Sequence, residues 1–199
     1  MSATFERNGE TAATTYAMLG SQNIWDTAHR CHDVLQAAGV RHAIVGGVAV
    51  FLHGYRRNTV DVDVLVRSED ADVVKSALQQ AQFSWSSEQR EFRSPAGIPV
   101  HFVLSNEPAG DDASYGVKFP DPSDSKAVGV IDGLPVVTLA RLMELKLACG
   151  LGNVRRTHRD FADVVELIVV HDLRGDFARF LHKSVRPAFR KLVRNARGE

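Results

Sequence analysis

The sequence predicts a mixed α/β (α+β) fold, in which a small mixed β-sheet with helices is followed by a helical C-terminal half. Short β-branched runs alternate with helix-periodic segments up to residue 137, and only helical patterns follow from residue 138. The 199 residues include 44% hydrophobic and 24% charged residues, an ordinary composition for a globular protein able to bury a core.

The expected organisation is a flexible tail at 1–20, an α/β core at 21–137 and a helical region at 138–199. The tail lacks the charged start and apolar segment of a signal peptide. No apolar stretch approaches the roughly 20 residues that span a membrane. Cys31 and Cys149 match no metal-binding or redox spacing, which favours a reducing compartment. We therefore expect a cytoplasmic protein with no membrane contact.

The first part of the core reads as helix, strand, short helix and strand. Ser21 can cap the first helix, apolar residues recur at helical spacing, and Gly39 can end it. The second strand is rich in β-branched residues, which favour a pleated sheet. The four expected elements are a helix at 22–38, a strand at 42–47, a helix at 48–54 and a strand at 59–66.

The remaining pattern continues the sheet and then becomes helical. Ser68 is the expected cap of the next helix and Thr138 the cap of the helix that follows the sheet. The expected elements are a helix at 69–81, short strands at 83–85, 89–93 and 98–105, a long loop at 106–126, two strands within 127–137, a helix ending at 149, a linker at 150–158, a helix at 159–171 and two basic helices.

Two aspartates stand in the otherwise apolar strand at 59–66. Side chains two residues apart in a strand point to the same face, so Asp61 and Asp63 project together, with Val60, Val62 and Val64 on the core face. Adjacent carboxylates repel unless a cation compensates them. A hard divalent ion such as Mg²⁺ takes oxygen ligands and often keeps substrate phosphates as further ligands. Asp61 and Asp63 are therefore candidate metal ligands.

A glycine pair lies between the first expected strand and the short helix. Glycine permits a tight turn and close approach of a ligand to the backbone, which makes Gly46 and Gly47 candidates for phosphate contact. A return of the chain would bring the aspartate strand beside the first strand. Metal and phosphate would then meet at one edge of the sheet.

The combined segment VGGVAVFLHGYRRNTVDVDVLV resembles the nucleotidyltransferase superfamily of the DNA polymerase beta type. Its matching positions are Gly46, Gly47, Ala49, Gly54, Arg57, Thr59, Asp61 and Asp63. The later segments LPVVTLARLMELKLACG and RRTHRDFADVVELI are similar to the AbiEii-like branch of minimal bacterial nucleotidyltransferases. The resemblance covers residues 40–170 and implies a nucleotidyltransferase core.

The resemblance implies metal-dependent transfer of a nucleotide from an NTP to a hydroxyl group, with Mg²⁺ or Mn²⁺ held by the two aspartates. The implied catalytic residues are Asp61, Asp63, His101 and Lys146. The implied nucleotide-binding residues are Gly46, Gly47, Arg57, Thr59, Lys146 and Asp160. Lys146 would approach the triphosphate or the acceptor as a point charge, and Asp160 or Asp163 would orient that lysine or an arginine. A salt bridge between helices is the alternative for the last two residues.

One position departs from the family pattern. The superfamily usually carries a third carboxylate where this chain has His101 in the strand GIPVHFVLS. A neutral imidazole could act as a base or bind a softer ion such as Mn²⁺ or Zn²⁺. Glu91 on a neighbouring strand could substitute as an acid. If neither applies, the metal site is incomplete, and a catalytically weak nucleotide- or partner-binding module is the alternative function.

Charge is distributed unevenly along a chain with no net charge. Residues 174–199 carry eight basic and two acidic side chains, so the remaining residues are acidic overall. The basic segment could contact a polyanion such as RNA, but a solvated helix face, or one docked on the acidic body, is the more common explanation of such a charge run. The acceptor expected from the resemblance is a hydroxyl of an RNA such as tRNA or of a protein. The resemblance adds a role in a toxin–antitoxin pair, with a cognate partner. The acidic loop at 107–124 leaves open a cationic aminoglycoside-type acceptor.

Overall fold

In the computed structural model, the described chain runs from residue 22 to residue 198, so the predicted tail and Ser21 lie outside it. The α/β part contains α2 (Gln22–Ala37), β1 (His42–Val45), α3 (Gly46–Leu52), β2 (Val62–Val66), η1 (Ser68–Asp70), α4 (Ala71–Gln80), β3 (Ser84–Ser86), β4 (Glu91–Arg93), β5 (Pro99–Leu104), η2 (Ala113–Tyr115), β6 (Val128–Ile131) and β7 (Leu134–Val137). The helical part contains α5 (Leu139–Gly152), α6 (Val154–Val170), η3 (Gly175–Phe180) and α7 (Arg186–Arg197).

The strands form one mixed sheet in the order β3-β4-β5-β2-β1-β7-β6. The chain returns after α3 to place β2 antiparallel to β1, while β5 lies parallel to β2 and β7 parallel to β1. The β6–β7 hairpin turns at Asp132 and Gly133, which both have positive φ angles, as a two-residue hairpin turn requires. The predicted α/β class and the predicted strand return are confirmed.

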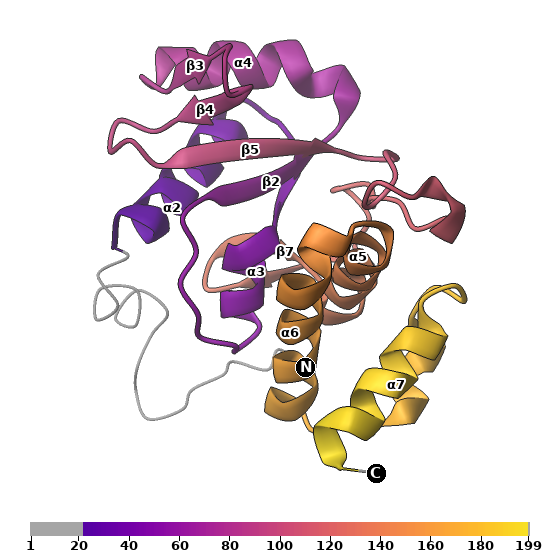
Figure 1. The fold of residues 1–199 in the computed structure, drawn as a ribbon. Helices are drawn as coiled ribbons and strands as arrows, with labels where there is room; N and C mark the ends of the chain where they lie inside the picture. The colour runs from indigo at the N-terminus through magenta and orange to yellow at the C-terminus, as the bar shows by residue number, and fades with distance from the viewer. Residues whose placement is uncertain (1–21, 199) are drawn as a thin grey trace.

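Helices cover both faces of this sheet (Figure 1). Helices α2 and α4 contact each other, and α2 also packs on β1 and β2. Helix α3 packs on the same two strands and contacts α5. The central strands are accordingly apolar, since β1 is buried throughout and Val62 and Val64 of β2 are fully buried.

Several expected boundaries are wrong. The first strand ends at Val45 and not at residue 47, so that α3 begins with the glycine pair, and the helix expected to end at 149 runs to Gly152. Ser68 does not cap the helix expected there, because it is the first residue of the 3-10 turn η1, and the cap position of α4 is held by Asp70. The linker expected at 150–158 is helical except at Asn153, whose side chain accepts a hydrogen bond from the Arg155 amide and caps α6. Helices α5 and α6 therefore form a close antiparallel pair.

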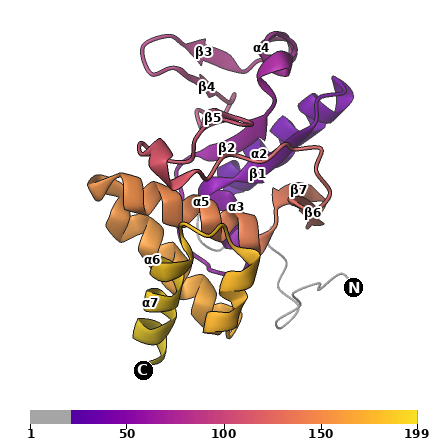
Figure 2. The ribbon, with the colours of Figure 1, turned by 90° about the vertical axis from the view of Figure 1, so that its right-hand side faces the viewer.

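The helical end of the chain packs away from the β3–β4 hairpin, at the opposite end of the molecule (Figure 2). Helix α7 contacts α6 and η3, with Phe189 fully buried. The first of the two expected basic helices is the 3-10 segment η3, and Pro187 lies in the first turn of α7 as predicted. Within residues 22–198, no helix has the length and apolarity needed to cross a membrane.

Candidate active site

The glycine pair forms the turn from β1 into α3. Gly46 has a φ of +63°, and a Cβ atom there would lie 1.8 Å from Oδ2 of Asp63. A Cβ atom at Gly47 would lie 2.3 Å from Oγ1 of Thr59. Side chains at these two positions would therefore collide with Asp63 and Thr59, which explains why glycine is needed at both.

Asp61 and Asp63 lie at the start of β2, next to the glycine turn. Asp63 is paired with Val45 across β1 and with His101 across β5. Asp61 precedes the strand, and its Oδ1 accepts a hydrogen bond of 2.9 Å from the Thr59 hydroxyl. Val60 is 72% exposed, so its predicted position on the core face is wrong, because the regular strand begins only at Val62.

The imidazole of His101 completes a compact cluster with the two aspartates. Its Nδ1 lies 3.6 Å from Oδ2 of Asp61 and 3.5 Å from Oδ1 of Asp63. Its Nε2 lies 2.9 Å from Oε2 of Glu91, on the neighbouring strand β4. The second Glu91 oxygen lies 2.6 Å from Nη2 of Arg93.

The surrounding carboxylates favour a positive charge on His101. Its contact with Asp63 is the largest cause, the hydrogen bond with Glu91 adds to it, and together they outweigh burial and raise the pKa of His101 to about 9. In the absence of a metal ion, an imidazolium thus compensates the aspartates at neutral pH.

These residues also fit a divalent cation. One ligand atom from each of Asp61, Asp63 and His101 lies within 4.8 Å of the other two, and all three residues are partly exposed. Two carboxylate oxygens and one imidazole nitrogen suit Mn²⁺ or Zn²⁺, and the oxygens alone suit Mg²⁺. Within residues 22–198 this is the one group of three or more such side chains close enough to share an ion.

A second charged group is buried between α5, α6 and the segment before β2. The Lys146 ammonium lies 2.9 Å from Asp160 and 2.8 Å from Asp163. Arg57 donates two hydrogen bonds, of 2.6 and 2.9 Å, to the two oxygens of Asp163. We call these four side chains, together with Arg156, the buried ion network.

The network is compensated within the protein. Burial alone would raise the pKa of Asp163, but the Arg57 hydrogen bond and Lys146 outweigh it and hold that pKa below its usual range. Arg156 donates to Asp160 at 3.1 Å with its side chain 56% exposed. Burial opposes its charge, but Asp160 and, among other groups, Asp63 raise the Arg156 pKa. Arg156 thus pairs with the network while more than half of its side chain stays exposed.

The structure separates the predicted site residues into these two groups. One group lies at one end of the central strands β5, β2 and β1 and comprises Gly46, Gly47, Thr59, Asp61, Asp63 and His101. The other group belongs to the buried ion network and comprises Arg57, Lys146 and Asp160. Lys146 is 5% exposed and bonded to both aspartates, so its predicted contact with a triphosphate remains a prediction. The sequence does not predict the pairing of Glu91 with His101, and it offers Arg156 only as one of three linker arginines that could bind phosphate or lie in a solvated loop.

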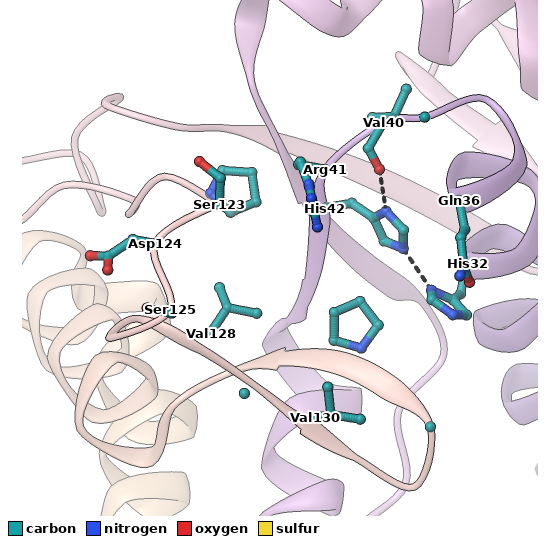
Figure 3. A pocket seen from close by; sticks show the side chains of 15 residues that line it. His32, Gln36, Val40, Arg41, His42, Ser123, Asp124, Ser125, Val128 and Val130 are labelled. Atoms are coloured by element: carbon teal, nitrogen blue, oxygen red, sulfur yellow. Dashed lines mark hydrogen bonds between the residues drawn. The ribbon is translucent and has the colours of Figure 1, made fainter.

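A separate pocket of about 550 Å³ lies between α2, β1, the β6–β7 hairpin and the loop before β6 (Figure 3). His32 and His42 share a hydrogen bond of 2.9 Å at its wall, and Nδ1 of His42 lies 2.8 Å from the Val40 carbonyl oxygen. Burial lowers the pKa of both histidines. None of the predicted site residues lines this pocket.

Comparison with family models gives one match: the aminoglycoside-2''-adenylyltransferase model aligns with residues 28–164. This segment covers more than half of the chain and includes both the acidic cluster and the buried ion network. A search of curated proteins gives no match.

Several solved structures share the fold. An antigenic nucleotidyltransferase-like protein from Paracoccidioides brasiliensis is 17% identical, with a TM-score of 0.57 over 88% of this chain and 89% of that one. ANT(2'')-Ia, solved in complex with adenylyl-2''-tobramycin, is 14% identical, with a TM-score of 0.52 over 83% and 96%. JHP933 from Helicobacter pylori is 18% identical, with a TM-score of 0.50 over 79% and 71%. These likenesses identify the fold.

Proposed function

This chain belongs to the aminoglycoside-2''-adenylyltransferase family, and from that premise we propose that it transfers a nucleotide from an NTP to a hydroxyl group of an acceptor. The observation that carries the proposal is the acidic cluster beside the glycine turn, where Asp61, Asp63 and His101 come within reach of one cation. Family membership makes nucleotidyl transfer the expected reaction, and the cluster supplies residues suited to it.

Asp61 and Asp63 would hold the divalent cation, with His101 as a third ligand. When bound, such an ion neutralises charge on the triphosphate and on the attacking and leaving oxygens. Thr59 would keep Asp61 turned toward the site through their hydrogen bond. Gly46 and Gly47 lack side chains and so let the Asp63 and Thr59 side chains lie against the turn, while their contact with phosphate stays a prediction of the sequence. An acceptor hydroxyl would release its proton to solvent and attack the α-phosphorus, the bond from that phosphorus to the oxygen bridging to the β-phosphate would break, and pyrophosphate would leave.

We propose Arg156 as a contact for the outer phosphates. It is more than half exposed, and Asp63 contributes to its electrostatic environment. Arg57, Lys146 and Asp160 would then act indirectly, by fixing α6 and the segment before β2 around the site. Direct nucleotide contact by Lys146, as the sequence resemblance implies, would require it to leave a buried pair of carboxylates.

Family membership favours a small aminoglycoside-type acceptor over the RNA or protein acceptor expected from the sequence resemblance. The AbiEii-like branch, a toxin–antitoxin role with a cognate partner, and a cytoplasmic location remain predictions of the sequence. The division into a core at 21–137 and a helical region at 138–199 is likewise a proposal. This division separates the sheet from α5, which carries Lys146, and from α6, which carries Arg156.

Transfer of label from α-labelled NTPs tests the proposal. Purified protein is incubated with each NTP and Mg²⁺ or Mn²⁺, and with tobramycin, total tRNA or total protein as acceptor. We expect metal-dependent labelling of one acceptor class, abolished by Asp63→Asn. Absence of labelling with every combination of nucleotide, metal and acceptor would refute the proposed activity.

The presence of His101 where the family pattern has a carboxylate specifically favours a second candidate, a nucleotide-binding module with weak or no catalysis. This module would bind labelled NTP with metal and transfer nothing, and His101→Asp would leave this unchanged. Transfer by the wild-type protein would exclude it.

A further inference from the structure

Glu91 has a geometry that its sequence position alone does not reveal. Residues Phe92 and Val100 are paired across antiparallel strands β4 and β5, so the same register brings Glu91 beside His101. The Glu91 side chain is only 9% exposed, and its Oε2 lies 2.9 Å from Nε2 of His101. A buried carboxylate thus faces one nitrogen of the imidazole, while the other nitrogen faces the two aspartates.

Glu91 itself does not reach the cation site. Its Oε2 is hydrogen-bonded to His101, and its buried Oε1 lies 2.6 Å from Nη2 of Arg93 as an ion pair without hydrogen-bond geometry. Among the described residues, the group of side chains able to share an ion comprises Asp61, Asp63 and His101 and does not include Glu91. This arrangement argues against Glu91 as a substitute acid and for an effect exerted through His101.

We propose that Glu91 is a positioning residue that accepts the Nε2–H of His101 and so directs Nδ1 toward Asp61 and Asp63 as the third ligand of a divalent cation. The inference rests on the proposed function of the acidic cluster. A histidine ligand that donates its other N–H to a carboxylate has a fixed tautomer, a fixed ring orientation and a more basic ligating nitrogen. The buried Glu91 would supply all three.

A nitrogen ligand in this position also changes the expected ion. Replacement of a carboxylate oxygen by an imidazole nitrogen favours Mn²⁺, Co²⁺ or Zn²⁺ over Mg²⁺. The structure therefore assigns to the Glu91–His101 pair a part in selecting the metal, beyond holding the strands β4 and β5 together.

Titration of Mn²⁺ into nucleotide-free protein, followed by electron paramagnetic resonance, tests the proposal. Glu91→Gln keeps an acceptor for Nε2–H but loses the charge, so we expect Mn²⁺ affinity to fall about five-fold. Glu91→Ala removes the acceptor and should weaken binding by about ten- to a hundred-fold. Glu88→Gln, an exposed residue of the same hairpin, is the matched control and should bind as the wild type does.

A spectroscopic measurement separates positioning from a structural role. In ¹⁵N-histidine spectra of the Zn²⁺-loaded wild type, the signals absent from His101→Gln should show the Nε2–H tautomer, with Nδ1 bound to metal. Metal bound through Nε2 would overturn the proposal, as would unchanged Mn²⁺ affinity in folded Glu91→Gln. Thermal unfolding with a chelator present verifies that each variant folds.

The same titrations distinguish this inference from the proposed function. A wild-type protein that binds Mn²⁺ through Asp61 and Asp63, shown by loss of binding in Asp63→Asn, but that is indifferent to both Glu91 substitutions refutes the inference alone. A wild-type protein that binds no Mn²⁺, with or without ATP, refutes both.

Discussion

The acidic cluster and the buried ion network contain the same kinds of groups, but they balance their charges differently. In the network, Lys146, Arg57 and Arg156 pair with Asp160 and Asp163 at 2.6–3.1 Å, and both aspartates are almost fully buried. In the cluster, the contacts between His101 and the aspartates are 3.5–3.6 Å long and partly exposed. The protein satisfies the network by itself, whereas the cluster leaves its carboxylates available to a ligand.

The comparison teaches that a conspicuous group of charged residues need not be the reaction centre. Buried carboxylates with permanent cations at hydrogen-bonding distance stabilise packing between helices. Carboxylates whose nearest protein cation is an imidazolium can bind a metal ion instead, once the imidazolium has lost a proton. The two groups should therefore respond to mutation in opposite ways, the network in stability and the cluster in activity.

The largest expected effect is on stability in the network. Asp163→Asn removes the charge that Lys146 and Arg57 share, and we expect it to lower the free energy of unfolding by about 3–5 kcal/mol, because the partly buried Arg57 loses the carboxylate that it bonds and the buried Lys146 keeps one carboxylate, Asp160. Chemical denaturation measures this loss. Glu166→Gln, on the same helix, is the control. A loss below about 1 kcal/mol would show that the network is not structural.

The opposite outcome is expected in the cluster. Asp61→Asn and Asp63→Asn should each lower nucleotidyl transfer on the order of a hundred-fold or more, because they remove a ligand of the reaction's cation. Stability should change little, since the lost repulsion between the two carboxylates is offset by a lost attraction to the His101 imidazolium. Label transfer and thermal unfolding are measured on the same preparations. Loss of stability with retained activity would reverse the assignment of the two regions.

Only the cluster should show a pH-dependent charge balance near neutrality. In metal-free protein, the folded-state pKa of His101 is about 9 and its ordinary value is 6.5. Its stabilising contribution is therefore fully present below about pH 6.5 and is lost as the pH rises through 9. Because the side chain is 38% exposed, screening reduces this contribution to about 1 kcal/mol.

Urea unfolding of wild type and His101→Gln in chelator, between pH 6 and pH 10, measures this contribution. The difference in stability between the two proteins should shrink as the pH rises. A difference that is constant across this range would contradict the electrostatic description of the cluster.

The smallest expected effect concerns Thr59, whose hydroxyl holds Asp61 in place. Thr59→Val keeps the shape and removes the hydrogen bond, so transfer should fall about five- to ten-fold, equivalent to about 1 kcal/mol. Steady-state kinetics should show the loss with little change in melting temperature. Unchanged kinetics would mean that Asp61 is positioned by β2 and the glycine turn alone.

The proximity of Asp61 and Asp63 follows from local spacing, whereas His101 joins them through the pairing of β5 with β2. Asp61 and Asp63 share a face through their spacing, and the glycine pair is needed at the turn beside them. The contact between Gly46 and Asp63 also depends on the pairing of β1 with β2, which the chain return made predictable. The class of fold and most of the strands follow from the same periodicity.

The network and the Glu91–His101 pair are harder to predict because they depend on packing between distant segments. Gly150 and Asn153 read as a linker, yet a Cβ atom at Gly150 would lie 2.7 Å from the Phe161 ring, so glycine serves the close contact of α5 with α6. This packing carries Lys146 to Asp160 and buries it. Likewise, only the register of β4 on β5 reveals which strand residue faces His101.

The central claim is that Asp61 and Asp63 bind a cation that in turn binds a triphosphate. Calorimetric titration of ATP into the wild type and the Asp61→Asn/Asp63→Asn double variant, each with and without Mn²⁺, tests it most directly. We predict that the wild type binds ATP much more tightly with Mn²⁺ and that the double variant loses this gain by about a hundred-fold or more. Equal Mn²⁺-dependent affinity in the two proteins would contradict the claim.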